Sequence, residues 1–243
     1  RIDGNVTATI NGGNYKVKAY DSGKTQHAVN VSGTATVTIL GGTFVGPKGT
    51  SADSGAAVNV QSGATVSISG GSFSGGKNNT LASKGTLTLT GGTYDQDVAS
   101  FCAEGYISDN NGNGTWTVRQ ANYVAQIGTV KYESLDEAFA AATEGQTVTM
   151  LTNITEDFDI NNTANVIFDM ATYTLTGAIK PSTANLTIKN GTIVNKNSSV
   201  SAIEINAGSL TLNEDVTIES ARHAVRIDGN VTATINGGNY KVK

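Results

Sequence analysis

Four segments of the chain share one short pattern, in which Thr or Ser alternates with aliphatic residues and a Gly-Gly pair is followed, two positions later, by an aromatic residue. The segments occupy residues 6–15, 35–44, 64–73 and 86–94, and weaker copies occupy residues 184–193 and 208–218. The Gly-Gly pairs begin at positions 12, 41, 70 and 91, which gives spacings of 29, 29 and 21 residues. Three short strands and three corners need about 20 residues or more, so this period predicts turns of a parallel β-helix with loops of variable length.

The alternation assigns each strand residue to a face, because successive side chains of a strand point to opposite sides of the sheet. We expect the aliphatic and aromatic positions to form an inward core ladder: Val37, Ile39, Val66, Ile68, Leu87, Leu89, Tyr15, Phe44, Phe73 and Tyr94. The hydroxyl positions then form an outward Thr ladder: Thr7, Thr9, Thr36, Thr38, Thr65, Thr86 and Thr88. A third strand with aliphatic residues at its second and fourth positions precedes each repeat, at residues 28–31, 57–60, 202–205 and 224–227.

The Gly-Gly pairs mark corners of the predicted coil. Glycine is favoured where φ is positive, and also where a Cβ atom would clash with the coil below. We expect one of these two constraints at eight structural corner glycines: Gly12, Gly13, Gly41, Gly42, Gly70, Gly71, Gly91 and Gly92.

A longer repeat is superimposed on the short one, because residues 226–243 repeat residues 1–18 without a difference. The two copies are 225 positions apart, so the chain reads as part of a tandem array of 225-residue units joined head to tail. A stack of coils tolerates such repetition, since each coil contacts only its neighbours. We therefore expect neighbouring repeat units of the same chain or filament to be the main partners.

Two segments depart from the coil pattern. Residues 95–120 predict a short helix and a hairpin that turns at an Asn/Gly cluster, and residues 121–150 predict two strands, a helix and another strand. In the second segment Ser134 and Glu137 form a capping-box pattern, and Gly145 is placed to end the helix. We expect four regions: coils in 1–94, a closing helix and hairpin in 95–120, an opening strand-helix-strand cap in 121–150, and coils again in 151–243.

Composition limits the partners of the chain. The formal net charge of −4 does not point to nucleic acid. No apolar run approaches the roughly 20 residues that cross a bilayer, so we expect no membrane contact within these residues. Cys102 is the only cysteine, and nothing basic beside it favours a thiolate, so we expect a small buried residue.

Catalysis on a parallel β-helix, as in pectin-acting lyases and hydrolases, needs carboxylates clustered with a basic group or calcium on adjacent coils. The candidate groups fall at corners or outward positions of the weaker coils: Glu156, Asp157, Asp159, Glu214, Asp215, Glu219, Arg222 and His223. Charge is the default at such solvated positions, so we expect no catalytic residue, no cofactor and no enzyme activity.

Two patterns match metal sites only in part. Asp109 and Asn111 begin a calcium-loop pattern, but its twelfth position is Gln120, where a bidentate Glu is needed, so a turn is favoured and calcium is the alternative. His27 and His223 occupy equivalent positions of the repeat, and two imidazoles without a third ligand are a weak pattern for a metal. We expect no metal site.

Two longer motifs point to a known repeat family. Residues 91–118, GGTYDQDVASFCAEGYISDNNGNGTWTV, and residues 130–151, VKYESLDEAFAAATEGQTVTML, are similar to its closing and opening segments. Together with the GGTF-type turns, they make nearly the whole chain resemble the Gly-rich right-handed β-helix repeats of large adhesin-like surface proteins of Gram-positive gut bacteria. The resemblance implies a right-handed coil, an extracellular, cell-surface or wall-attached location, and no catalytic residues.

The sequence thus predicts an all-β chain, a right-handed parallel β-helix solenoid with one small strand-helix-strand cap per 225-residue repeat. Its expected function is that of a non-enzymatic structural repeat in the shaft of a long adhesin or surface filament.

Two other functions fit parts of the pattern. A carbohydrate-binding or carbohydrate-acting β-helix would line a groove with exposed aromatics and carboxylates, and its partners would be host glycans or other cell-surface proteins. A flat array of Thr-x-Thr strands would suit an ice-binding face, although Thr is favoured on any exposed β face and the array is interrupted at Asn165 and Ile167.

Overall fold

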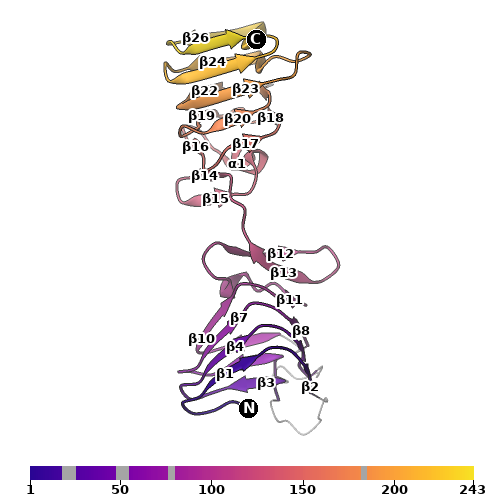
Figure 1. Ribbon diagram of the computed structural model, residues 1–243. Helices are drawn as coiled ribbons and strands as arrows, with labels where there is room; N and C mark the ends of the chain where they lie inside the picture. Colours follow the sequence, from indigo (N-terminus) through magenta and orange to yellow (C-terminus); the bar gives the residue numbers. More distant parts are fainter. Residues whose placement is uncertain (18–25, 48–54, 76–79, 182–184) are drawn as a thin grey trace. The chain divides into compact units, whose positions relative to one another are not determined.

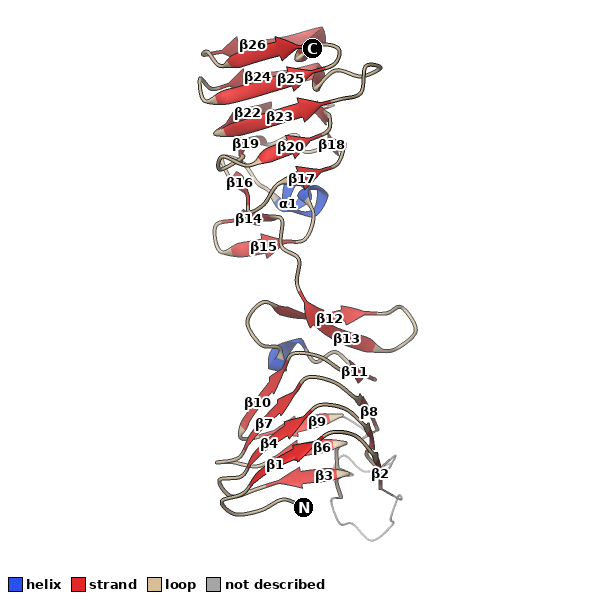
Figure 2. Cartoon of the chain, viewed as in Figure 1, coloured by secondary structure: helices blue, strands red, loops and turns tan. Residues whose placement is uncertain are grey.

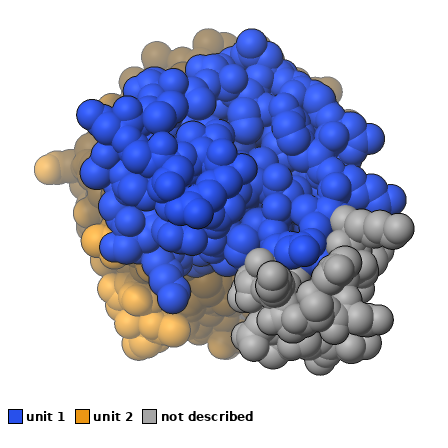
Figure 3. Space-filling view, turned by 90° about the horizontal axis from the view of Figure 1, so that it is seen from below, with its two compact units in different colours: residues 1–121 blue, residues 122–243 orange. Residues whose placement is uncertain are grey.

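The computed structural model describes residues 1–17, 26–47, 55–75, 80–181 and 185–243. Strands dominate these residues, so the chain is all-β, as the sequence predicts (Figures 1 and 2). It divides into two compact units, Arg1–Ala121 (unit 1) and Asn122–Lys243 (unit 2), which Figure 3 distinguishes by colour. The finer division into four regions stays a prediction. Lys18 and Ala184, which belong to segments expected to form coils, lie outside the described residues.

The described residues of unit 1 form three sheets, in which equivalent strands of successive repeats lie side by side, and the second sheet also includes the two strands of a hairpin. The first sheet contains, in order, β1 (Thr7–Ile10), β4 (Thr36–Ile39), β7 (Thr65–Ile68) and β10 (Thr86–Leu89). The second contains β2 (Asn14–Lys16), β5 (Thr43–Val45), β8 (Ser72–Ser74), β11 (Thr93–Tyr94), β13 (Trp116–Gln120) and β12 (Tyr106–Asn110). The third contains β3 (Val29–Val31), β6 (Val58–Val60) and β9 (Leu81–Ser83). We call the strands that one repeat contributes to these sheets a layer.

The described residues of unit 2 form two sheets. The larger contains β15 (Val130–Tyr132), β14 (Ala125–Ile127), β16 (Thr147–Met150), β19 (Asn165–Asp169), β22 (Asn185–Lys189), β24 (Ile203–Leu212), β21 (Ile179–Pro181) and β18 (Phe158–Ile160), with β26 (Val225–Ile235) paired to β24. The smaller contains β17 (Ile154–Thr155), β20 (Thr174–Thr176), β23 (Gly191–Asn195), β25 (Val216–Ser220) and β27 (Asn239–Val242).

Strand β24 differs from the sequence prediction. Two separate strands were expected, one in residues 202–205 and the other beginning at residue 208. One strand instead runs through Ile203–Leu212, with a shift in its register against β26 between Ile205 and Ala207. The first part of the strand pairs with β21 at Ile203, and its last four residues pair with β22, so one strand connects two rows of shorter strands. A bulge allows this because it changes the local twist without ending the ladder.

Strand pairing keeps equivalent residues of successive repeats side by side. In the first sheet of unit 1, Val37 lies between Ala8 and Val66. A slip of one residue would turn the inward aliphatic side chains toward solvent, so the alternating burial fixes this register. Buried residues of all three sheets form one hydrophobic core in unit 1, and those of unit 2 form another.

A short helix, α1 (Leu135–Ala141), interrupts the strands of unit 2 at the position that the sequence predicts. The Oγ of Ser134 accepts a hydrogen bond from the backbone N–H of Glu137 at 3.1 Å, which caps the first turn. The prediction that Gly145 ends the helix was wrong. Ala142 already adopts an extended conformation, and Gly145, with φ of +76°, serves the turn that follows.

The parallel stacking of unit 1 stops at a hairpin. A single 3-10 turn, Ala99–Phe101, leads into β12 and β13, which pair antiparallel. Strand β13 also pairs antiparallel with β11, where Tyr94 lies opposite Trp116. A further parallel layer cannot follow in that direction, because the hairpin occupies the edge that it would need.

Candidate functional site

An aromatic column runs through unit 1. The rings of Tyr15 and Phe44 are 4.9 Å apart, those of Phe44 and Phe73 are 4.8 Å apart, and those of Phe73 and Tyr94 are 5.0 Å apart. The interplanar angles are 3°, 4° and 11°. Tyr94 is buried, which raises its pKa, and its hydroxyl donates to the carbonyl of Gly91 at 2.8 Å. The spacing of this column is that of adjacent β-strands, so each ring marks one layer.

The other ladder residues occupy opposite faces of the first sheet. The aliphatic members are at most 9% exposed: Val37, Ile39, Val66, Ile68, Leu87 and Leu89. The threonine members are exposed or half-buried: Thr7, Thr9, Thr36, Thr38, Thr65, Thr86 and Thr88. In unit 2 the equivalent columns include Asn165 and Ile167, so the Thr array is interrupted there.

The two glycines of each pair are required for different reasons: the second by its backbone conformation and the first by lack of space. The second glycine has φ between +102° and +115° in all four pairs: Gly13, Gly42, Gly71 and Gly92. The first glycine lies against the layer below, and an added Cβ would meet a carbonyl oxygen at 3.1, 2.5 and 2.1 Å at Gly41, Gly70 and Gly91. Gly12 is the exception, because nothing lies within 4 Å of a Cβ built there. It belongs to the first layer of unit 1, whose strands β1 and β2 lie at the ends of their sheets in the part of the chain that the structure describes.

The duplicated segment forms the first layer of unit 1 (residues 1–17) and the last layer of unit 2 (residues 226–243). We call the edge that faces later layers the forward edge, and the edge that faces earlier layers the backward edge. In unit 1 the forward edge is paired: Leu40 N–H donates to the carbonyl of Ile10 at 2.9 Å, and Thr43 N–H donates to that of Gly13 at 2.8 Å.

The same segment is paired through its other edge in unit 2. The N–H of Asn236, the equivalent of Asn11, donates to the carbonyl of Leu212 at 2.9 Å. Within strands, Ala233 pairs with Leu210 and Tyr240 pairs with Ile218. The two units therefore use different backbone groups of one sequence, and the described residues pair its backward edge only in unit 2.

A cavity of about 850 Å³ lies beside α1 in unit 2. Its lining includes the carboxylates of Asp136, Asp157 and Asp159 and the ammonium of Lys180. The carboxylate of Asp157 also accepts a hydrogen bond from Ala178 N–H at 2.7 Å, so one of its two oxygen atoms is already bonded to the backbone. With three carboxylates and one ammonium group, the lining is mainly acidic.

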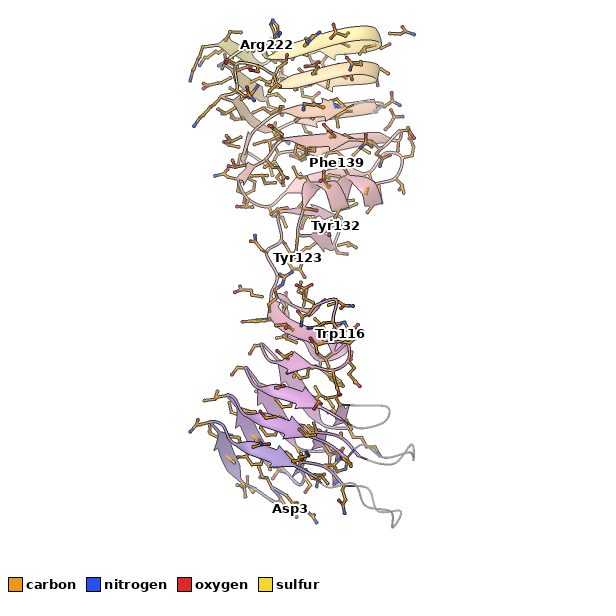
Figure 4. The ribbon with its side chains drawn as sticks, turned by 90° about the vertical axis from the view of Figure 1, so that its right-hand side faces the viewer. Asp3, Trp116, Tyr123, Tyr132, Phe139 and Arg222 are labelled. Carbon is orange, nitrogen blue, oxygen red and sulfur yellow. The ribbon has the colours of Figure 1, made fainter. Side chains whose placement is uncertain are left out.

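Phenylalanine side chains that pack against one another support the wall of this cavity next to α1. Phe139, labelled on α1 in Figure 4, lies 5.5 Å from the ring of Phe158 and 5.3 Å from that of Phe168. The second pair is nearly perpendicular, at 68°, in contrast to the stacked rings of unit 1. Asn162 donates to the carbonyls of Phe139 and Ala142 at 2.7 Å each, which fixes the end of α1 against the cavity wall.

A column of alternating charge continues from this cavity across unit 2. Asp159 pairs in register with Lys180, and Glu204 pairs in register with Arg226, whose Nη1 lies 3.4 Å from Oε1 of Glu204. These four side chains and Arg222 line a second cavity of about 390 Å³. Because these side chains are exposed to solvent, each ion pair contributes little to stability. The main effect of the charges is on the electrostatic attraction of polar or charged molecules to this surface.

Of the candidate groups that the sequence offers for catalysis, Asp157 and Asp159 line the cavity beside α1. The pKa of Glu156 is raised by burial and, to a smaller extent, by the charge of Asp136. Asp215 accepts a hydrogen bond from Asn190 N–H at 3.0 Å, and Glu219 pairs with Lys243. Arg222 donates to a backbone carbonyl, and Nδ1 of His223 lies 3.3 Å from the hydroxyl of Ser201. Several of these groups thus have a local structural contact. The described residues contain no group of three or more His, Cys, Asp or Glu that could hold a metal ion.

The calcium-like pattern forms the tip of the β12–β13 hairpin. Asp109 forms an ion pair with Arg119 at 2.8 Å, and Asn111 donates to the hydroxyls of Thr115 and Thr117. These side chains are thus used in contacts within the hairpin.

The two histidines lie in different units. Nδ1 of His27 accepts a hydrogen bond from Ala56 N–H at 2.9 Å, and burial lowers its pKa below the ordinary value of 6.5. Cys102 is half-buried, and burial, followed by the charge of Asp97, raises its pKa. This thiol is therefore mostly protonated near neutral pH, but the residue is only half-buried where the sequence predicts burial.

No protein-family model, curated protein or solved structure matches this chain. Among the described residues, none of the helices is both long and apolar enough to pass through a membrane.

Proposed function

We propose that this chain is a non-enzymatic extracellular structural repeat whose layers form a right-handed parallel β-helix, and that tandem copies of it make the shaft of a long adhesin or surface filament. The observation that carries this proposal is the opposite use of the duplicated segment. Unit 1 pairs its forward edge and unit 2 pairs its backward edge, so a single copy of the segment has suitable neighbours on both sides.

The side chains support the same junction. When the two copies are treated as one layer, Leu210, Ala233 (Ala8) and Val37 fall in one inward column. Ile218, Tyr240 (Tyr15) and Phe44 fall in another. Both columns then continue from unit 2 of one repeat into unit 1 of the next without a change of register.

The charges are also compatible with a single shared layer. Glu219 of unit 2 forms ion pairs with Lys241 and Lys243 of the duplicated segment, and Glu204 forms one with Arg226. These opposite charges lie across the boundary where the last layer meets the rest of unit 2. The duplicated segment is thus matched to the layer that precedes it as well as to the layer that follows.

The mechanical consequence is length. The sheets hold four layers in unit 1 and five in unit 2, and one shared layer leaves about eight per repeat. With strands about 4.8 Å apart, each repeat would add about 40 Å to a shaft. Repetition then extends the reach of whatever lies at the tip, and each added repeat is stabilised by its neighbours.

The test is to express chains of one, two and three 225-residue repeats and to image them by negative-stain electron microscopy. The proposal predicts thin rods whose length grows by about 40 Å per repeat. Compact particles whose longest dimension does not increase with repeat number would overturn it.

A second candidate function is carbohydrate binding, which the acidic cavity beside α1 and the adjoining charged column favour. The carboxylates of these linings can accept hydrogen bonds from sugar hydroxyls, and the lysine and arginine side chains can donate hydrogen bonds to them. A glycan array probed with the wild-type chain and with Asp159→Ala and Lys180→Ala variants separates the two functions. Binding that both variants abolish would support the carbohydrate role, whereas no binding would leave the shaft as the function of this segment.

A further inference from the structure

We infer that the cavity of about 390 Å³ in unit 2 is a binding site for the carboxylate of an acidic sugar, such as a uronic or sialic acid at the end of an oligosaccharide. This inference rests on carbohydrate binding, the second candidate function, and gives it a ligand class. The cavity lies on the side of the layers, where outward residues of β18, β21, β24 and β26 line it. A further layer beside β26 would therefore extend this column of side chains without covering it.

The lining of this cavity carries more positive than negative charge. It contains three cations and two carboxylates: Lys180, Arg222, Arg226, Asp159 and Glu204. Nη1 of Arg226 lies 3.4 Å from Oε1 of Glu204, and its Nε lies 2.7 Å from Oδ2 of Asp228, so these charges offset one another. In the part of the chain that the structure describes, neither Lys180 nor Arg222 forms an ion pair with a carboxylate. Two cations of one cavity are therefore available to an anion.

Hydrogen bonds hold Arg222, labelled in Figure 4, beside the cavity. Its backbone N–H donates to Oγ of the buried Ser220 at 3.2 Å, and its Nη1 donates to the carbonyl of Ser199, which also lines the cavity. A guanidinium has several N–H donors, so one bond to a carbonyl leaves others for a ligand. Because the group is planar, it can bind a carboxylate through two parallel hydrogen bonds.

The loop that carries Ser199 and Val200 is also fixed. Asn195 is 3% exposed, and its side-chain amide donates to the carbonyl of Val200 at 2.8 Å while its Oδ1 accepts from Asn197 N–H at 2.9 Å. Oδ1 of Asn197 in turn accepts from Ser199 N–H at 2.9 Å. A site whose walls are already ordered loses less conformational entropy when a ligand binds, so these bonds favour binding.

The rest of the lining favours a sugar over other anions. Val200 is the one apolar residue among the described residues that line the cavity, so an apolar acid would gain little there. The carboxylates of Asp159 and Glu204 can accept hydrogen bonds from ring hydroxyls. Asp159 and Lys180 also line the acidic cavity beside α1, so the two cavities adjoin and the next sugars of a chain would lie in the acidic one. The carboxylates there repel ligands with many negative charges, so a single carboxylate fits best.

The test is a titration of the whole chain with three sugars, followed through amide chemical shifts in nuclear magnetic resonance. The probes are methyl glucuronide, the methyl glycoside of N-acetylneuraminic acid and methyl glucoside. At least one acidic sugar should bind about 10-fold or more tightly than the neutral glucoside, since its carboxylate adds hydrogen bonds to charged groups. Its affinity should fall as the salt concentration rises. The tighter of the two acids identifies the source of the carboxylate.

Two variants and a matched control locate the site. Arg222→Gln and Lys180→Gln each remove one cation and should weaken binding of the acidic sugar by about 10-fold or more. Lys241→Gln removes an exposed cation of β27, outside the cavity, and should bind as the wild type does. Urea unfolding should show that all three variants fold like the wild type.

Several outcomes would overturn the inference. These are equal affinity for acidic and neutral sugars, wild-type affinity in both Arg222→Gln and Lys180→Gln, and tighter binding of a heparin fragment than of either acidic sugar. Carbohydrate binding itself would survive the first of these outcomes, because neutral sugars would still bind. No binding of any sugar would overturn both the inference and the carbohydrate candidate. The shaft is tested separately by imaging and does not depend on either result.

Discussion

The two copies of the duplicated segment have one sequence but different surroundings. In unit 1 its carbonyls at Ile10 and Gly13 accept hydrogen bonds from the following layer, and in unit 2 the N–H of Asn236 donates to the preceding layer. Ile235 is 53% exposed, whereas Ile39, at the same position of an interior layer, is fully buried. A layer therefore buries its apolar side chains only when a neighbouring layer lies on each side, so its stability depends on those neighbours more than on its own residues.

The largest expected difference concerns an inward position. Val37→Asp places a carboxylate in the core of unit 1, where it has no partner, and should lower the free energy of unfolding by about 4 kcal/mol or more. Ala233 has the equivalent position in the last layer and is exposed. Ala233→Asp should therefore lower the free energy of unfolding by less than about 1 kcal/mol.

Urea unfolding followed by circular dichroism measures both changes, with Thr36→Asp as the outward control. Thr36 is exposed beside Thr7 and Thr65, so this substitution should change stability by only about 0.5 kcal/mol. Equal losses for Val37→Asp and Thr36→Asp would mean that the inward and outward faces have been assigned wrongly.

The aromatic column gives the next largest effect. Phe44 is fully buried and stacks on two rings, so Phe44→Ala should cost about 3 to 5 kcal/mol. Tyr240 is only half-buried at the end of its column, and Tyr240→Ala should cost about 1 to 2 kcal/mol.

The two aromatic substitutions can be told apart by fluorescence, because Trp116 is the only tryptophan and lies in unit 1. Phe44→Ala should move the unfolding midpoint reported by Trp116, and Tyr240→Ala should leave it unchanged. A shift of the same size in both variants would show that the end of a column is as tightly packed as its interior.

A smaller effect is expected at the corner glycines. Gly70→Ala brings a Cβ within 2.5 Å of the Leu40 carbonyl, and the backbone shift that relieves this contact should cost about 1 to 3 kcal/mol. Gly12→Ala meets no atom and should leave stability unchanged or raise it by about 0.5 kcal/mol, since it restricts the unfolded chain. The midpoints of thermal unfolding of the two variants measure this difference. A lower midpoint for Gly12→Ala than for the wild type would show that other atoms already pack against Gly12.

The smallest effect is a dependence on pH. Burial lowers the pKa of His27 in the folded chain, so its neutral form is the one that folding favours. Stability should therefore be complete above about pH 6.5 and decrease as the pH falls below that value, since protonation removes the acceptor for Ala56 N–H. His27→Asn, which retains an acceptor oxygen, should flatten the stability of unit 1 over this range, and an unchanged slope would exclude His27 as its source.

The features that could be predicted from the sequence are those set by local alternation. A period of two residues is visible in the sequence itself. It predicts the strand at Thr36–Ile39 and the burial of Val37 and Ile39. The positive φ of Gly42 follows from the turn chemistry of a Gly-Gly pair. Repetition of these signals at 29-residue spacing made the strand pattern predictable.

The features that could not be predicted depend on contacts between distant residues. The cavity beside α1 joins Asp136 of the helix to Asp159 and Lys180 of two later strands, and no local pattern connects them. The hydrogen bond from Ala56 to His27 spans 29 residues and depends on how two layers align. The merging of two expected strands into β24 likewise depends on the neighbouring strand and not on its own sequence.

The most direct test of the central claim, that one layer uses opposite edges in the two units, is amide hydrogen exchange measured by nuclear magnetic resonance at a concentration where the chain is monomeric. The N–H of Asn236 donates to Leu212 and should be protected, whereas the N–H of its equivalent, Asn11, lies on the backward edge of the first layer and should exchange rapidly. The N–H of Leu40, which donates to Ile10, should be protected as an internal reference. Equal exchange rates at Asn11 and Asn236 would contradict the claim.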